Sequence, residues 1–93
     1  MSDVSNDRSD DAVLGRLIER SRLLIALSDE IPTETKLQTQ PLLKQLEQLL
    51  GPPEGSRDVG RIHATHAMLV DELADFADLD ALLSAMTNFL PPR

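Results

Sequence analysis

Apolar residues in the last third of the chain recur at every third or fourth position. One stripe runs from Val59 to Phe76, and a second runs from Leu79 to Leu90. Residues at this spacing share one face of an α-helix, so the pattern predicts helix over residues 57–90. His66 stands inside the first stripe, where another apolar residue would be expected.

The two stripes are out of phase with each other. The shift favours separate helices over residues 57–77 and 79–90, with one kinked continuous helix as the alternative. Asp78 or Asp80 is a candidate N-cap of the second helix, because a carboxylate can accept hydrogen bonds from the first free N–H groups. Ser56 is the candidate cap of the first helix.

The first half of the chain predicts a helical hairpin. Apolar residues at helical spacing indicate helices over residues 9–29 and 33–50, and the dipeptide Ile31-Pro32 separates them because the residue before proline avoids helical geometry. Pro41 either kinks the second helix or begins it. The segment Gly51-Pro52-Pro53 ends it.

Gly15 lies inside the first predicted helix. It either costs about 1 kcal/mol of stability relative to alanine or allows another helix to approach closely, and the pattern does not choose between these. Residues 1–8 are polar and charged, and we expect a disordered acidic tail there. Residues 9–90 then form a single all-α domain, a bundle of three to four helices with the hairpin packed on a long, kinked or broken C-terminal helix.

Composition limits the classes of partner. The chain has 93 residues and a formal net charge of −7, with seven acidic and seven basic residues balanced within residues 12–61. Direct nucleic-acid binding is disfavoured because phosphate contacts require clustered Lys and Arg. The acidic residues of 71–80 are a solvated face or a patch for a basic protein. A domain of this size buries only about 60% of its unfolded surface, so we expect a protein partner or a homodimer.

The chain lacks cysteine, which fits a reducing compartment. Its polar start is unlike a signal peptide, and no apolar run approaches the roughly 20 residues needed to cross a bilayer. We therefore expect a cytoplasmic protein without a membrane segment. Glycine-rich phosphate loops, serine elbows and cysteine nucleophiles are all lacking, so we expect neither an enzyme nor a cofactor.

His63 and His66 are the two histidines. They lie three positions apart and could face one metal ion, but a specific site needs further ligands, so metal binding is an alternative to the main hypothesis. His66 is otherwise a seam residue with a hydrogen-bonded neutral ring. On that interpretation, replacing it with leucine should stabilise the fold or the dimer.

Two sets of residues on these stripes are assigned, one to packing and the other to binding. The predicted packing or dimer seam consists of Ile62, His66, Leu69, Leu73 and Phe76. The predicted partner-binding surface, beside an acidic flank, consists of Leu79, Leu83, Met86, Phe89 and Leu90.

The strings IHATHAM at residues 62–68 and LLSAMTNFLPP near the C-terminus are similar to the TraM family of quorum-sensing antiactivators. A loop containing Gly-Pro precedes them, as it does in that family. The resemblance covers about a third of the chain and implies a small all-helical, dimeric protein that binds a LuxR-type transcription factor. It assigns no site residues. The leading hypothesis is therefore a small acidic helical regulator or adaptor that binds a protein, with an antiactivator as one form of it.

Overall fold

The computed structural model describes the backbone of residues 2–92 and the side chains of residues 11–53 and 55–92. Its helices are α1 (Ser2–Leu27), α2 (Thr33–Leu50), α3 (Val59–Leu73) and α4 (Ala77–Met86), with a short 3-10 turn, η1 (Glu54–Ser56), between α2 and α3. The described residues contain no strand, so the predicted all-α bundle is confirmed.

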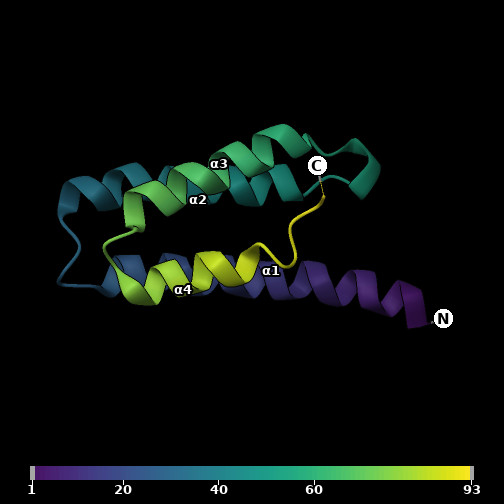
Figure 1. Ribbon diagram of the computed structural model, residues 1–93, viewed down its shortest axis with the longest axis horizontal. Coiled ribbons are helices and arrows are strands. Elements are labelled where there is room, and N and C mark those ends of the chain that lie inside the picture. The colour runs from purple at the N-terminus through teal and green to yellow at the C-terminus, as the bar shows by residue number, and fades with distance from the viewer. Residues whose placement is uncertain (1, 93) are drawn as a thin grey trace.

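The four helices run alternately in opposite directions. Helices α1 and α4 form one layer and α2 and α3 form the other (Figure 1). Helix α1 packs against both α2 and α4, and α3 packs against the same two helices. The bundle therefore consists of two helical hairpins, and it is elongated, with extents of 45 × 22 × 16 Å.

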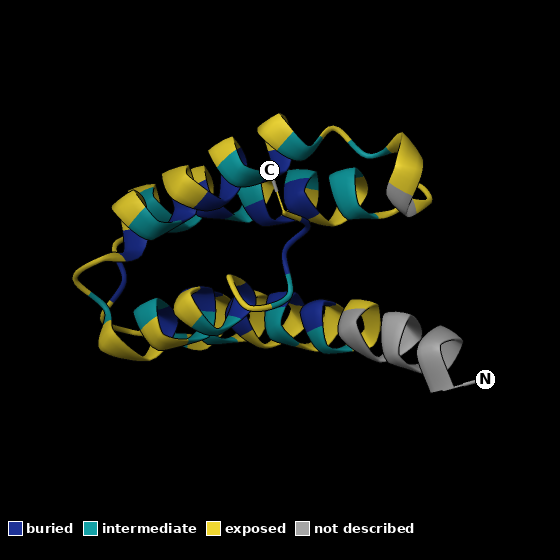
Figure 2. Ribbon diagram, turned by 45° about the vertical axis from the view of Figure 1, so that its right-hand side comes forward, coloured by how far each residue is buried: buried dark blue, intermediate teal, exposed yellow. Residues whose placement is uncertain are grey.

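The buried residues, coloured dark blue, lie mainly on the sides of the helices where the two layers meet (Figure 2). All four helices contribute to this core, as the periodic spacing of their apolar residues requires. The core is aliphatic and lets the single chain enclose its own apolar stripes. Its buried apolar residues are Leu14, Ile18, Ile25, Ile31, Leu43, Leu46, Ile62, Leu69, Leu73, Leu79, Leu83, Met86 and Leu90.

The first hairpin matches the prediction closely in its second helix. Helix α2 occupies residues 33–50 as expected and continues through Pro41, which is exposed. Helix α1 ends at Leu27 and begins at Ser2, although the sequence placed its start near residue 9 and a disordered tail over residues 1–8. Extending an existing helix costs much less than starting one, so a polar segment can continue it. Met1 lies outside the described residues.

The second hairpin corrects the predicted boundaries. Helix α3 ends at Leu73, and a turn over residues 74–76 separates it from α4. The Phe76 N–H donates to the Leu73 carbonyl at 3.0 Å, and the Asp80 N–H donates to the Phe76 carbonyl at 2.9 Å. The break therefore precedes Asp78, and α4 ends at Met86 instead of continuing to residue 90.

The caps also differ from those predicted. Asp58 caps α3, because its carboxylate accepts a hydrogen bond from the Arg61 N–H at 3.1 Å, whereas Ser56 belongs to η1. Asp78 and Asp80 lie inside the first turn of α4, and Phe76 occupies the N-cap position. Carboxylates in a first turn still interact favourably with the positive end of the helix. No helix in the described part of the chain combines the length and apolarity that crossing a membrane requires.

Replacing Gly15 with alanine should stabilise the protein. Gly15 is exposed, and a Cβ atom built there meets nothing within 4 Å, so no helix depends on its small size. We expect the free energy of unfolding to rise by about 0.5–1 kcal/mol, because alanine restricts the unfolded chain and favours helix.

Urea denaturation of Gly15→Ala would measure this gain. Gly51→Ala serves as the control, because its Cβ would lie only 3.3 Å from the Gln48 carbonyl oxygen and should bring less benefit. A loss of stability in Gly15→Ala would show that the glycine is needed for packing.

Candidate partner-binding site at one end of the bundle

The turns of the two hairpins lie at the same end of the molecule (Figure 1). We call this region the acidic end and define it as residues 28–36 and 71–80. It contains a single basic residue, Lys36. Its acidic residues are Asp29, Glu30, Glu34, Asp71, Glu72, Asp75, Asp78 and Asp80.

The acidic end carries the formal net charge of the whole chain. The sequence has 16 acidic and 9 basic residues, giving −7. Eight of the acidic residues and one of the basic residues belong to the acidic end, which leaves equal numbers of each elsewhere. The charge of this protein is therefore segregated, and a field concentrated on one surface attracts oppositely charged partners.

These carboxylates face solvent. All are exposed except Asp80, which is half-buried. The ion pairs found among the described side chains, Arg22–Glu19 and Arg57–Asp11, lie outside the acidic end. Lys36 directs its ammonium group to the Ala26 carbonyl oxygen at 3.3 Å.

The Arg22–Glu19 pair links neighbouring turns of α1. Hydrogen bonds from the Arg22 guanidinium hold the pKa of Glu19 below its ordinary value, and Glu19 in turn raises the pKa of Arg22. Both side chains are about half exposed, so the pair contributes little to stability. It neutralises its own charges and so adds nothing to the field of the acidic end.

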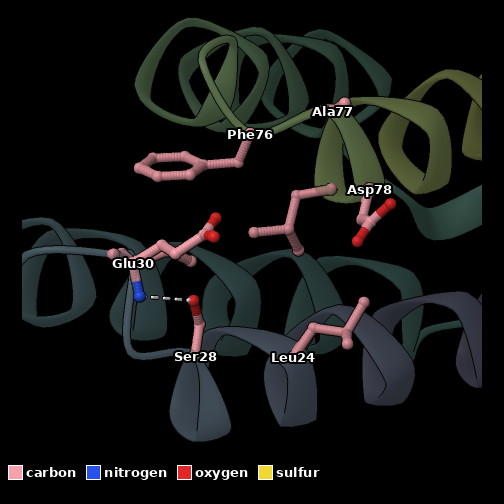
Figure 3. Close-up of a pocket in the computed structure, with 8 residues that line it drawn as sticks. Leu24, Ser28, Glu30, Phe76, Ala77 and Asp78 are labelled. Carbon is pink, nitrogen blue, oxygen red and sulfur yellow. Dashed lines mark hydrogen bonds between the residues drawn. The ribbon is translucent and has the colours of Figure 1, made fainter.

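A groove of about 190 Å³ opens between the two turns. Leu24, Ser28, Glu30 and Ile31 line it from the first hairpin, and residues 76–79 line it from the second. The carboxylates of Glu30 and Asp78 point into the space between the turns, and the ring of Phe76 lies along one edge (Figure 3).

The floor of the groove is apolar and held in place by the core. Ile31 and Leu79 are buried, and Leu24 and Phe76 are half-buried. The polar wall is ordered locally, because the Glu30 N–H donates to the Ser28 hydroxyl at 3.1 Å. The groove thus combines an aliphatic and aromatic interior with a carboxylate on each side.

Two exposed leucines border the acidic end in the sequence. Leu27 is 78% exposed and lies three residues from Leu24, which makes the two neighbours on the surface of α1. Leu37, near the start of α2, is 70% exposed. Large side chains exposed to this degree are candidates for contact with another molecule when they gather in one region.

The predicted partner-binding residues are placed mostly in the core. Leu79, Leu83, Met86 and Leu90 are buried, and Phe89 is half-buried and packed against them. Leu79 alone among the five lines the groove. A partner could reach Leu83, Met86 and Leu90 only if α4 and the segment after it moved away, so the role of the five residues in binding stays a prediction.

The predicted seam residues pack within one chain. Ile62, His66, Leu69 and Leu73 are buried between α3 and its neighbours. Phe76 lies in the turn between α3 and α4 and lines the groove. Their use in a dimer therefore also stays a prediction.

His66 fastens α4 to α3. Its Nε2 atom donates to the Leu83 carbonyl oxygen at 2.8 Å. That carbonyl lies in the last turn of α4, where carbonyl groups lack their usual helical donors. The Thr87 N–H, which would bond to Leu83 in a continuing helix, donates to the Ser84 oxygen. The imidazole therefore satisfies a buried acceptor that the end of the helix leaves free.

His63 holds the C-terminal segment in the same way. Its Nε2 atom donates to the Pro91 carbonyl oxygen at 2.7 Å, beside the buried Leu90. A carbonyl oxygen only accepts, so both rings carry a hydrogen on Nε2. Both Nε2 atoms are thus directed to separate backbone oxygens. The described residues contain no cluster of three or more His, Asp or Glu arranged to hold a metal ion.

Sequence reasoning identified the acidic residues of the second hairpin but missed those of the first. Asp29, Glu30 and Glu34 were included in a segment of balanced charge. The signal that would have revealed them is the topology, because two antiparallel hairpins joined in series place both of their turns at one end.

Searches against models of protein families, curated proteins and solved structures found no match to this chain.

Replacing His66 with leucine should destabilise the fold, contrary to the expectation from sequence. The leucine would fill the apolar seam but would leave the Leu83 carbonyl without a donor. An unsatisfied buried acceptor costs about 1–3 kcal/mol. Chemical denaturation of His66→Leu and of His66→Gln, which keeps a donor, would measure this, and a more stable leucine variant would contradict the assignment.

The acidic end should limit stability through repulsion between its carboxylates. Asp75 lies exposed in the turn between α3 and α4, so Asp75→Asn should raise the free energy of unfolding by up to about 0.5 kcal/mol at low salt. The gain should shrink in about 0.5 M NaCl, because salt at this concentration screens the repulsion between exposed carboxylates. Equal gains at both salt concentrations would refute the electrostatic cause.

Proposed function

We propose that this chain is a non-enzymatic protein-interaction module, a small acidic helical regulator or adaptor that acts in the cytoplasm. The observation that carries this proposal is the segregation of the net charge onto one end of the bundle, around a groove with an apolar floor. Apolar surface supplies affinity in protein complexes, whereas charge supplies steering and selectivity. The acidic end offers both in one place.

The cost of this arrangement supports a binding role. Eight carboxylates gathered around two turns repel one another, and a protein without a use for them would be more stable with the charges dispersed. Proteins commonly retain destabilising arrangements where function needs them. An acidic surface retained beside exposed leucines is therefore more consistent with recognition than with solubility alone.

An antiactivator of a transcription factor is one regulator of this class. We propose that specific role only from the resemblance of residues 62–68 and 82–92. In the structure the first string lies on α3, where Ile62, Thr65 and His66 are buried and Met68 is 55% exposed. Its buried residues serve the core, so the acidic end provides the stronger argument for binding.

Affinity capture from the native cell tests the proposal, with charge reversals as matched variants. Asp75→Lys changes the acidic end, and Glu47→Lys makes the same change of charge on the exposed part of α2 outside it. We expect a protein that is retained by the unmodified chain and by Glu47→Lys and is reduced several-fold by Asp75→Lys, because that reversal weakens the field of the acidic end.

Reproducible absence of any such protein would count against an interaction module. Equal capture by both variants would place the binding surface elsewhere. Light scattering of the purified chain at micromolar concentration would show separately whether it binds a second copy of itself.

A further inference from the structure

We propose that the groove of the acidic end is the docking site for a positively charged protein segment that inserts one large aliphatic or aromatic side chain. This inference rests on the proposed function and specifies the chemistry of the partner. It is drawn from the size of the groove, the nature of its floor and the sign of the charge around it.

The size of the groove favours a single inserted side chain. Its volume is about 190 Å³, smaller than the roughly 300–1,000 Å³ of pockets that enclose small molecules. One leucine- or phenylalanine-sized group from a peptide fits this scale better than a complete metabolite does. Such an anchor in a small pocket, surrounded by weaker contacts, is the usual arrangement of an interface hot spot.

The floor of the groove suits an apolar anchor. Ile31 and Leu79 are buried members of the core and provide a rigid base, and the half-buried ring of Phe76 forms an edge. Leu27 extends this apolar surface outward along α1, beside Leu24. An inserted side chain would therefore contact the exposed parts of Leu24 and Phe76 above this base, between polar walls formed by Ser28, Glu30 and Asp78.

The charge around the groove selects a basic segment. Glu30 and Asp78 point into it from opposite hairpins (Figure 3), and six further carboxylates surround them on the same end. Lys or Arg residues flanking the anchor would meet opposite charge on both sides. An acidic segment or a nucleic acid would be repelled, so charge complementarity identifies the occupant as a basic stretch of protein.

A second groove on the bundle shows what the acidic end adds. It lies between α1 and α2, is larger at about 590 Å³, and is also lined by apolar residues. Its charged residues are balanced, because two acidic residues, Glu19 and Glu47, and two basic residues, Arg22 and Lys44, line it. A basic segment has no electrostatic reason to prefer it, and a reversal of Glu47 there is a matched control.

The test uses a fluorescein-labelled peptide in which several lysines flank a single leucine, together with a second peptide that carries alanine in place of the leucine. Fluorescence anisotropy at low salt measures the affinity of each for the full chain. We expect the leucine peptide to bind at least several-fold more tightly than the alanine peptide. Raising the salt concentration should weaken both, because the attraction is screened.

Two pairs of variants locate the binding. Glu30→Lys should weaken the leucine peptide by about tenfold, because it removes a carboxylate from the groove and adds a repelling charge, whereas Glu47→Lys should change affinity much less. Ala77→Trp should fill the groove and abolish the preference for leucine over alanine. Ala67→Trp, at an exposed position on α3, should retain it. Circular dichroism confirms that each variant is folded.

The outcomes separate this inference from the function it rests on. Lack of peptide binding at low salt would overturn the inference, as would equal losses in the two charge reversals or an unchanged leucine preference in Ala77→Trp. If Ala77→Trp still captures the same cellular protein as the unmodified chain, the interaction module stands and the groove is not its contact. If no cellular protein is captured by any form, the proposed function fails first.

Discussion

The turn at residues 74–76 determines how the four helices enclose a common core. It divides one long amphipathic stretch into α3 and α4 and directs α4 back along α1. Without it, the apolar residues of α4 would project away from the bundle and leave the face of α1 uncovered. With this turn, the chain forms four helices that enclose a core, whereas one continuous C-terminal helix would leave the core open on one side.

The hydrogen bond from His66 to Leu83 holds the fold-back in place. Helix α4 has only 10 residues and would not persist in water as an isolated helix. Its stability comes from burial of Leu79, Leu83 and Met86, and from a donor supplied to its last turn by the neighbouring helix. The same imidazole that interrupts the apolar stripe in the sequence therefore completes the hydrogen bonding of the next helix.

Much of this fold could be predicted from the sequence because local signals determine it. The spacing of apolar residues predicted helix in all four segments but left one kinked helix as the alternative over residues 57–90. The dipeptide Ile31-Pro32 and the segment Gly51-Pro52-Pro53 placed the first two connections. The residue at which α3 breaks before α4 could not be predicted, because the turn over residues 74–76 contains neither proline nor glycine. The turn is closed instead by the hydrogen bond from the Phe76 N–H to the Leu73 carbonyl. The hydrogen-bond acceptor of His66 could not be predicted either, because the Leu83 carbonyl is brought to the imidazole only by the folding of α4 against α3.

The candidate site is an example of information that resides in topology. Glu30 and Asp78 are 48 positions apart, and nothing in their local sequence relates them. They face one groove because Glu30 lies in the turn between α1 and α2, Asp78 follows the turn between α3 and α4, and the two hairpins put both turns at one end. Sequence reasoning assigned binding to Leu79, Leu83, Met86, Phe89 and Leu90, but these residues pack in or against the core. The partner surface that we propose instead is the acidic end.

The distance between α3 and α4 in solution tests the fold-back most directly. The chain lacks cysteine, so Arg61→Cys and Ser84→Cys, at exposed positions, can be spin-labelled without removing other thiols. If α4 returns along α3 as the account requires, pulsed electron resonance should give a mean separation below about 20 Å, since packed helices lie about 8–10 Å apart. A mean near 35 Å, roughly the rise of 23 residues in one continuous helix, would contradict the fold-back and the acidic end that depends on it.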